Sequence, residues 1–203
     1  MKIIGLTGGI ATGKSQVSSI LSELGAIIID ADIVSREVVQ KGLPAWQQIK
    51  DVFGEEYLLS NGELNRKKLG ELVFSDPNAL NKLNRITHPA IRAKIEDRIN
   101  NLKAQGYEGI IVVDAALLLE TGWETMVDQV WVVDAPIEKR IERLMNRDNL
   151  TRDQALSRIN SQMSQQERIA KADKIIYNNS DIDSLEKQVL RIWNETLEEI
   201  NRQ

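Results

Sequence analysis

The sequence contains no cysteine and only one histidine among its 203 residues. Without cysteine there can be no disulfide bonds, thiolate zinc sites or thiol nucleophiles. The single histidine, His88, excludes a histidine-rich metal centre and a relay between two histidines. Any catalysis must therefore depend on carboxylate, lysine, arginine or hydroxyl groups.

Long apolar runs and an excess of positive charge are also missing. No segment approaches the roughly 18 apolar residues that span a bilayer, and the N-terminal MKIIGLTGG reaches glycine too early for a signal peptide. The 30 acidic residues outnumber the 26 basic ones, which disfavours sequence-independent binding to nucleic acid. We therefore expect a cytoplasmic protein that binds small molecules, with no nucleic-acid or membrane partner.

Short apolar runs rich in β-branched residues alternate with helical patterns along the chain. The composition, 42% hydrophobic and 28% charged, is that of a soluble globular protein of one domain. Alternation of strand and helix predicts an α/β fold with a parallel sheet. The expected strands are 2–7, 26–30, 110–114, 129–134 and 174–177, and a long helix with an apolar face from Ile182 to Ile200 follows the last of them.

Two segments interrupt this alternation. Residues from about 34 to 107 carry mainly helical patterns and predict a helical insertion, in which His88-Pro89 is expected to break one helix and start another at Pro89. Residues 147–172 contain two capping-box patterns, Thr151-x-x-Gln154 and Ser164-x-x-Glu167, which predict short polar helices. Because little apolar surface anchors them, we interpret this segment as a mobile lid. The core would comprise 1–33, 108–146 and 173–203.

The pattern G-x-x-x-x-G-K-S, a P-loop, spans Gly8–Ser15 directly after the first expected strand, and its last residue, Ser15, opens the first expected helix. Its glycines allow successive backbone N–H groups to converge on a phosphate, to which the helix N-terminus adds partial positive charge. Lys14 would reach the β- and γ-phosphates, and the Ser15 hydroxyl would bind a Mg²⁺ that arrives with the nucleotide. The sequence therefore predicts a nucleotide site, although a glycine-rich turn without ligand is the structural alternative.

Other residues decide between the reactions that share this loop. The nearest match to the guanine-binding N-K-x-D is Asn81-Lys82-Leu83-Asn84, which lacks the aspartate and lies in a helical stretch. Asp114 closes a strand where a Walker B aspartate would hold the hydration shell of magnesium, but Ala115 follows it where a motor-type ATPase commonly has glutamate. GTPase and motor activities are thus disfavoured, and a kinase is favoured.

Asp30-Ala31-Asp32 stands at the end of the second expected strand, where the carboxyl ends of parallel strands converge on a ligand. Asp32 is the candidate base that accepts the proton of an acceptor hydroxyl. The alternative is that Asp32 caps a helix that begins near Ile33. Asp30 is expected to be a supporting group at the end of the strand.

Arginines gather in and before the expected lid, namely Arg140, Arg143, Arg147, Arg152, Arg158 and Arg168. One or two of them would neutralise charge on the transferred phosphoryl group, while exposed ion pairs such as Lys139 with Glu142 are the alternative for each. His88 is either a structural residue or a ligand contact. Arg92 either meets a ligand phosphate or pairs with Glu96 one turn later. The run Arg66-Lys67-Lys68 is expected to be a solvated face and Trp131 to be core.

Taken in order, several short patterns resemble the dephospho-coenzyme A kinases over nearly the whole chain. Members of this family are similar to nucleoside monophosphate kinases and phosphorylate the ribose 3′-hydroxyl of dephospho-coenzyme A with ATP. The patterns are the P-loop with Leu6-Thr7 before it, Asp30-Ala31-Asp32 with Arg36, Thr87-His88-Pro89 with Ile91-Arg92, Leu117-Leu118 with Glu120, Arg140 with Arg143 and Arg147-Asp148, Arg158 with Gln162, and Ala172-Asp173 leading to Asn178.

The resemblance implies a three-layer P-loop kinase fold whose five parallel strands lie in the order second, third, first, fourth, fifth. It implies that Asp32 is the base, that Lys14 and Arg140 stabilise the phosphates, and that Arg143, Arg147 and Arg158 serve in the lid. The ATP-binding residues would be Gly8, Gly9, Ile10, Ala11, Thr12, Gly13, Lys14, Ser15, Gln16 and Asn178, the last of these near the adenine. The acceptor would contact Asp32, Arg36, His88, Arg92 and Leu117.

The chain departs from the family pattern at Ala11-Thr12, where Gly-Ser is usual, and at Gln16, Ala116 and Tyr177. Ala11 fits only if its position does not require a positive φ. Two rival functions remain at this point. One is another nucleoside or nucleotide kinase of the same fold, and the other is a nucleotide-dependent binding switch that has no acceptor.

Overall fold

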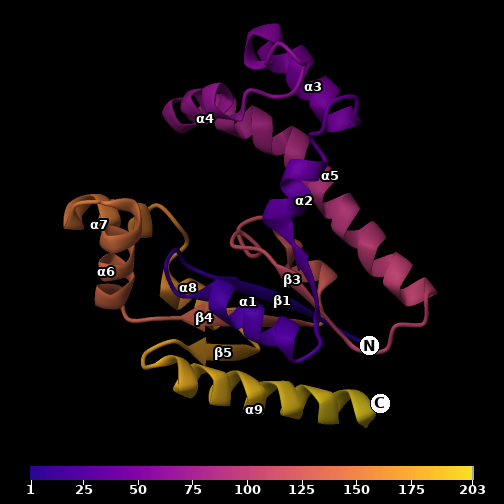
Figure 1. Ribbon diagram of the computed structural model, residues 1–203, viewed down its shortest axis with the longest axis vertical. Coiled ribbons are helices and arrows are strands. Elements are labelled where there is room, and N and C mark those ends of the chain that lie inside the picture. Colours follow the sequence, from indigo (N-terminus) through magenta and orange to yellow (C-terminus); the bar gives the residue numbers. More distant parts are fainter. Residues whose placement is uncertain (203) are drawn as a thin grey trace. The chain divides into compact units, whose positions relative to one another are not determined.

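The computed structural model describes residues 1–202, and its internal contacts divide the chain into two units (Figure 1). The first, which we call the sheet unit, comprises Met1–Ile29 and Gln105–Gln203. The second, the helical unit, is Asp30–Ala104.

The sheet has five strands in the order β2-β3-β1-β4-β5. The central strand β1 runs parallel to β3 and β4, with Leu6 opposite both Asp114 and Trp131. The five expected strands and their order are therefore confirmed, as is the α/β class. Their bounds are β1 Lys2–Gly8, β2 Ile27–Asp30, β3 Ile110–Asp114, β4 Gln129–Asp134 and β5 Lys174–Tyr177.

Helices α1 (Lys14–Glu23) and α9 (Ile182–Asn201) cover one face of the sheet and contact each other (Figure 1). Alternate residues of the strands point to this face because successive side chains of a strand point to opposite sides. Trp131 is fully buried among them, which confirms it as core. Leu185, Val189 and Ile192 form the apolar face of α9, as the spacing predicts. No helix within residues 1–202 is long and apolar enough to cross a bilayer.

The segment expected to be a lid lies in the sheet unit and forms two helices, α7 (Arg152–Asn160) and α8 (Gln165–Ala170). Both predicted capping boxes are present, at Thr151 and Ser164. The expectation of little apolar anchoring is wrong for α7. Ala155 and Ile159 are buried against Ile141 and Leu144 of α6 (Ile137–Asp148), because α7 packs directly on that helix. The short helix η2 (Trp123–Met126) follows β3.

The helical unit packs α2, α3 and α4 against the long helix α5. Trp46 and Ile49 of α3 are buried, and Ile91, Ile95 and Ile99 form the buried stripe of α5, in agreement with the expected helical patterns. The indole N–H of Trp46 donates a 3.0 Å hydrogen bond to the Gly62 carbonyl. The bounds are α2 Ala31–Glu37, α3 Pro44–Phe53, η1 Glu55–Tyr57, α4 Arg66–Ser75 and α5 Pro77–Ala104.

The predicted break at His88-Pro89 is wrong, because α5, a helix of 28 residues, continues through Pro89. Proline removes one backbone donor and crowds the preceding turn. The Thr87 hydroxyl donates to the Leu83 carbonyl at 3.0 Å in that turn, and the buried isoleucines that follow hold the helix in place. Tertiary packing here outweighs the local preference of proline.

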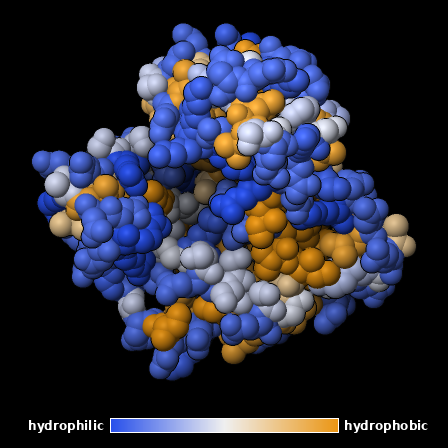
Figure 2. All heavy atoms as spheres, turned by 45° about the horizontal axis from the view of Figure 1, so that its top comes forward, coloured by the Kyte–Doolittle hydropathy of each residue, from blue (hydrophilic) through white to orange (hydrophobic). Residues whose placement is uncertain are grey.

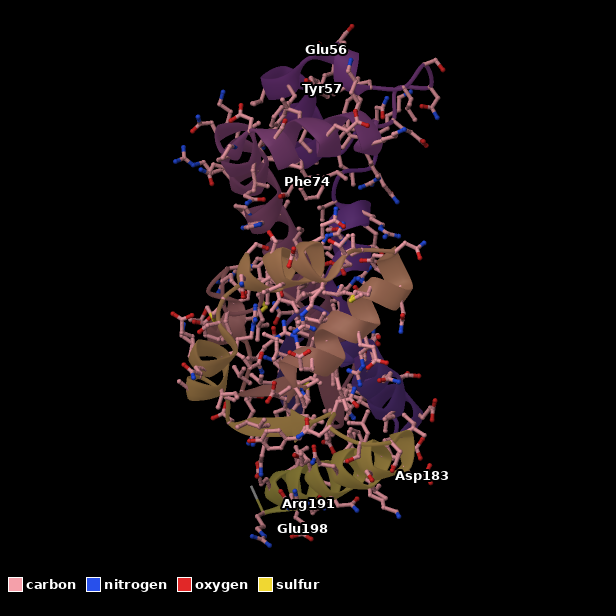
Figure 3. All side chains as sticks on the ribbon, turned by 90° about the vertical axis from the view of Figure 1, so that its left-hand side faces the viewer. Glu56, Tyr57, Phe74, Asp183, Arg191 and Glu198 are labelled. Atoms are coloured by element: carbon pink, nitrogen blue, oxygen red, sulfur yellow. The ribbon has the colours of Figure 1, made fainter. Side chains whose placement is uncertain are left out.

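Apolar side chains interrupt a mostly hydrophilic surface (Figure 2). The most exposed large one is Phe74 of α4, which is 92% exposed; Figure 3 labels it together with Tyr57 and Glu56, which belong to the same unit. The basic run Arg66-Lys67-Lys68 at the start of α4 is exposed, as predicted. Lys68 lies over the Tyr57 ring at 5.1 Å from its centroid.

Candidate active site

The P-loop connects β1 to α1 and has its own internal hydrogen bonds. The Thr12 N–H and hydroxyl both donate to the Gly9 carbonyl, at 3.2 and 2.9 Å, and so curl the chain. Gly13 is the N-cap of α1 and no side chain caps this end. Backbone N–H groups at an uncapped helix N-terminus, together with the helix dipole, form a site for an anion such as phosphate.

Two glycines of this loop are required by its geometry. Gly13 has a φ of +93°, and a Cβ there would collide with the Asn178 amide. Gly9 has little space, since a Cβ there would lie 2.5 Å from Nη2 of Arg140 and 3.3 Å from Nη1 of Arg168. The glycines therefore allow both a left-handed turn and the close approach of two guanidinium groups.

Ala11 adopts a φ of +61°, so its position does use the left-handed region. The condition under which alanine would fit without cost is therefore not met. A left-handed conformation costs an L-residue about 1–2 kcal/mol, because its Cβ crowds the following carbonyl. The structure offsets this cost by packing Ala11 beside the apolar cluster of α6 and α7 and by directing Arg143 to its carbonyl.

Lys14 and Asp114 form an ion pair at the carboxyl end of β3. Asp114 is the last residue of β3 and is 6% exposed. Ser15 is an exposed residue of the first turn of α1. Through residue 202, no group of three or more His, Cys, Asp or Glu side chains could hold a metal ion. The oxygen donors expected for a metal here are the Ser15 hydroxyl and the Asp114 carboxylate.

Two arginines of α6 hold the carbonyls of the P-loop. Arg140, 4% exposed, donates from Nε to the Ile10 carbonyl at 2.9 Å. Arg143 donates from Nη1 to the carbonyls of Ala11 and Thr12, at 3.1 and 3.2 Å. Burial, and secondly the Arg168 guanidinium, lower the pKa of Arg140, whereas the Asp134 carboxylate opposes this shift. Both side chains place positive charge against the phosphate loop.

Arg168 of α8 is fully buried, a role that sequence reasoning missed. It forms an ion pair with Glu120 and donates to the Met163 carbonyl at 2.7 Å. The signal that could have found it is Glu120, which belongs to the patterns that carry the family resemblance. Without the fold, however, nothing in the sequence pairs these residues, which are 48 positions apart.

The remaining lid arginines are exposed and paired in this structure. Asp148 binds both Arg147 and Arg158, at 2.8 and 2.9 Å. Arg152 binds Glu138 with two hydrogen bonds of 2.8 Å. The alternative of exposed ion pairs is thus confirmed for these three, although Lys139 donates to the Asn179 carbonyl and not to Glu142.

Asn178, the residue predicted to lie near the adenine, is 4% exposed and contacts the P-loop. Its Nδ2 donates to the Thr12 carbonyl at 2.9 Å and to Oε1 of Gln16 at 3.1 Å. A further side chain, Gln162, reaches the same loop from the segment between α7 and α8 and accepts a hydrogen bond from the Ile10 N–H. The sheet unit therefore brings together most of the predicted nucleotide-site residues around one loop.

In the helical unit, Asp30 and not Asp32 caps α2. The Asp30 carboxylate accepts hydrogen bonds from the N–H groups of Asp32 and Ile33, at 2.7 and 3.1 Å. The capping alternative for Asp32 is therefore wrong, because the helix begins at Ala31, two residues earlier than expected. Asp32 presents its carboxylate to solvent from the first turn of α2.

The other residues predicted to contact the acceptor substrate lie on two helices and in the segment after β3. Arg36 is exposed on α2, and its carbonyl accepts a hydrogen bond from Arg66 at 3.1 Å. His88 and Arg92 are one turn apart on α5, where burial lowers the pKa of His88. Arg92 pairs with Glu96 at 2.9 Å, as one of its alternatives predicted. Leu117 follows β3 in the sheet unit and is 45% exposed.

Comparisons with known proteins agree with the family resemblance that the sequence shows. The sequence profile of the dephospho-CoA kinase family matches residues 2–184. The dephospho-CoA kinase of Moorella thermoacetica is 45% identical over 195 residues, which cover 96% of this chain and 92% of that protein. The enzyme of Geobacter sulfurreducens is 46% identical over 193 residues, covering 95% and 98% of the two chains.

Solved structures show the same likeness. A Thermus thermophilus protein has a TM-score of 0.79 and 31% identity, covering 96% of this chain and 97% of its own. A dephospho-CoA kinase from Campylobacter jejuni has a TM-score of 0.73 and 30% identity, covering 96% of each. The shikimate kinase of Acinetobacter baumannii, with 16% identity and a TM-score of 0.52, shares the fold, covering 98% of this chain and 94% of its own.

Proposed function

Because the chain belongs to the dephospho-coenzyme A kinase family, we propose that it transfers the γ-phosphoryl group of ATP to the ribose 3′-hydroxyl of dephospho-coenzyme A. This reaction gives coenzyme A and ADP and is the last step of coenzyme A biosynthesis. The observation that carries the proposal is the match of the family over nearly the whole chain. The P-loop geometry supplies the nucleotide chemistry that such a reaction needs.

The sheet unit binds ATP in this proposal. The N–H groups that follow Gly8 and the uncapped N-terminus of α1 surround the phosphates. Lys14 leaves Asp114 to bind the β- and γ-phosphates, and Arg140 stabilises charge that develops on the transferred group. Asn178 holds the P-loop at the Thr12 carbonyl and would border the adenine, and Gln16, which accepts a hydrogen bond from Asn178, would also contact ATP.

Magnesium fits the donors present, because the Ser15 hydroxyl and the Asp114 carboxylate are hard oxygen ligands. With so few protein ligands, the ion is expected to bind together with the phosphates of the nucleotide. When bound, it neutralises charge on the β- and γ-phosphates. Ser15 would be its direct ligand, and Asp114 would hold its hydration shell.

Asp32 is the proposed base. Its carboxylate orients the 3′-hydroxyl and accepts its proton as the hydroxyl oxygen bonds to the γ-phosphorus and the bond to the β,γ-bridging oxygen breaks. The capping of α2 by Asp30 leaves the Asp32 carboxylate available for this role. Arg36, His88, Arg92 and Leu117 would contact the acceptor, with His88 neutral near pH 7 because burial lowers its pKa.

The segment 147–172 acts as the lid in this proposal, with the insertion at about 34–107 binding the acceptor and the rest of the chain forming the core. Arg147 and Arg158 would exchange Asp148 for phosphate, while Arg143 already lies at the P-loop. Exclusion of water by such a lid limits hydrolysis of ATP. We further propose that the enzyme acts in the cytoplasm.

The test is release of ADP by the purified protein with Mg-ATP and a panel of acceptors, namely dephospho-coenzyme A, adenosine, AMP, CMP and pantetheine phosphate. Only dephospho-coenzyme A should support turnover. Asp32→Asn should lower kcat by about 10²–10⁴-fold, the usual contribution of a general base, while binding of ATP is retained. Turnover with another acceptor would replace the substrate, and ATP binding without any turnover would favour a nucleotide-dependent switch.

A further inference from the structure

One residue of the P-loop, Ile10, is bound through its N–H, its carbonyl and its side chain by residues outside the loop. The Ile10 N–H donates to Oε1 of Gln162 at 2.8 Å, and the Ile10 carbonyl accepts from Arg140 at 2.9 Å. The Ile10 side chain packs against the apolar cluster that contains Ala155 and Ile159 of α7. Both polar groups of this residue are thus satisfied by side chains more than 100 positions away in sequence.

The next residue is the strained one. Ala11 has a φ of +61°, and a non-glycine residue keeps such a conformation only where its surroundings determine it. Arg143 donates a hydrogen bond to the carbonyl of Ala11 itself. The peptide group that precedes Ala11 carries the Ile10 carbonyl, which Arg140 binds, and Gln162 binds the N–H one peptide earlier.

We propose that Gln162 is a positioning residue for ATP, because its carboxamide oxygen holds the Ile10 N–H and thereby keeps Ala11 left-handed. This inference rests on the proposed binding of ATP at the P-loop. Arg140 and Arg143 bear charge and can act on phosphate directly, whereas Gln162 is neutral and already accepts a hydrogen bond from the loop. Its contribution is therefore to the shape of the loop.

The proposal explains how a P-loop with alanine at this position keeps its shape. Glycine adopts positive φ without the steric cost, so a loop with glycine at position 11 would not need the same support. Gln162 lies between α7 and α8, and the position of these helices is thereby coupled to the conformation of the phosphate loop.

The test measures the Kd of Mg-ATP by calorimetry, and steady-state kcat and KM, in two backgrounds. Gln162→Met removes the acceptor oxygen at similar volume, beside a cavity of about 380 Å³ that Gln162 lines. We expect Kd and KM for ATP to rise about 5-fold, which corresponds to one ordinary hydrogen bond, with kcat changed less than about 2-fold. In the Ala11→Gly background the same substitution should raise Kd less than about 2-fold, since glycine needs no support.

Gln165→Met is the matched control. Gln165 lines the same cavity, and its buried amide has no hydrogen-bond partner among the described residues, so Kd should not change. An equal rise of Kd in both backgrounds would overturn the proposal, as would a lower Tm for Gln162→Met with unchanged Kd. If the wild-type protein binds no ATP, the proposed function fails as well. If the wild-type protein and Gln162→Met bind ATP with equal Kd, only the positioning role fails.

Discussion

The two units of the molecule hold their candidate site residues in opposite ways. In the sheet unit, Lys14, Arg140 and Arg168 are each bound by a partner of the same unit, and two of the three are nearly or fully buried. In the helical unit, Asp32 and Arg36 present their charged groups from the exposed side of α2. The candidate residues of the sheet unit are thus fixed by its packing, whereas Asp32 and Arg36 of the helical unit present their charge to solvent.

This difference indicates where substitutions will act. Buried charged groups lose their hydration, so a partner that is removed leaves a costly unpaired charge. Exposed groups keep their hydration, so their substitution affects the reaction and leaves the free energy of unfolding nearly unchanged. The sheet unit should therefore couple activity to stability, and the helical unit should separate them.

Lys14→Met should have the largest effect. It removes the cation proposed to bind the β- and γ-phosphates, and kcat should fall about 10²–10³-fold, the cost of one electrostatic contact in a transition state. It should also destabilise the fold, because Asp114 remains buried and unpaired. The double variant with Asp114→Asn should recover stability and not activity. Full activity of Lys14→Met would contradict the proposed role of this lysine at the phosphates.

Arg168→Met should come next and affect stability. Loss of the ion pair with Glu120 should lower the free energy of unfolding by about 3 kcal/mol, the low end for buried pairs, because Glu120 retains some solvent contact. Urea denaturation measures this change. Arg152→Met is the matched control, since its pair with Glu138 is exposed and should contribute nothing measurable. Equal effects of the two variants would show that burial does not distinguish the lid arginines.

Asp30→Ala tests the helical unit with a smaller expected effect. Loss of the two hydrogen bonds that cap α2 should cost about 1 kcal/mol. Asp30→Asn keeps the capping oxygen and should retain most of the stability. Thermal unfolding followed by circular dichroism distinguishes the two. An equal loss for both substitutions would mean that Asp30 contributes through its charge and not as a cap.

His88 should give the smallest effect, seen in the pH dependence of stability. Because burial lowers the pKa of His88 below the usual value of about 6.5, the unfolded chain binds this proton more readily than the folded one. Stability should therefore fall as the pH decreases below about 6.5 and stop falling, for this group, below the folded pKa. Urea titrations at several pH values should show a weaker dependence for His88→Asn. An unchanged dependence would contradict the shift.

The features that the sequence predicted correctly are those with local causes. The β-branched runs, the P-loop and both capping boxes depend on residues close together in the chain, and all are present in the structure. The order of strands came from family resemblance and also holds. The proposed roles of Asp32, His88 and the lid residues remain predictions.

The features that could not be predicted depend on distant contacts. Arg168 and the exposed Arg152 both belong to short helices that begin with a capping box, and packing beside Glu120 is what buries Arg168. Pro89 carries a strong local signal for a break, which the buried face of α5 overrides. Aspartate is a good capping residue at either position, and the extended backbone of Asp30 makes it, and not Asp32, the N-cap of α2.

The distribution of tryptophan gives each unit its own optical reporter. Trp46 is the only tryptophan of the helical unit, where its indole is 8% exposed and hydrogen bonded to Gly62. The sheet unit holds the other three, Trp123, Trp131 and Trp193, all buried. With these three replaced by phenylalanine, tryptophan fluorescence would follow the helical unit alone. Comparing this signal with far-UV circular dichroism, which follows both units, would show whether the two units unfold in one transition or in two.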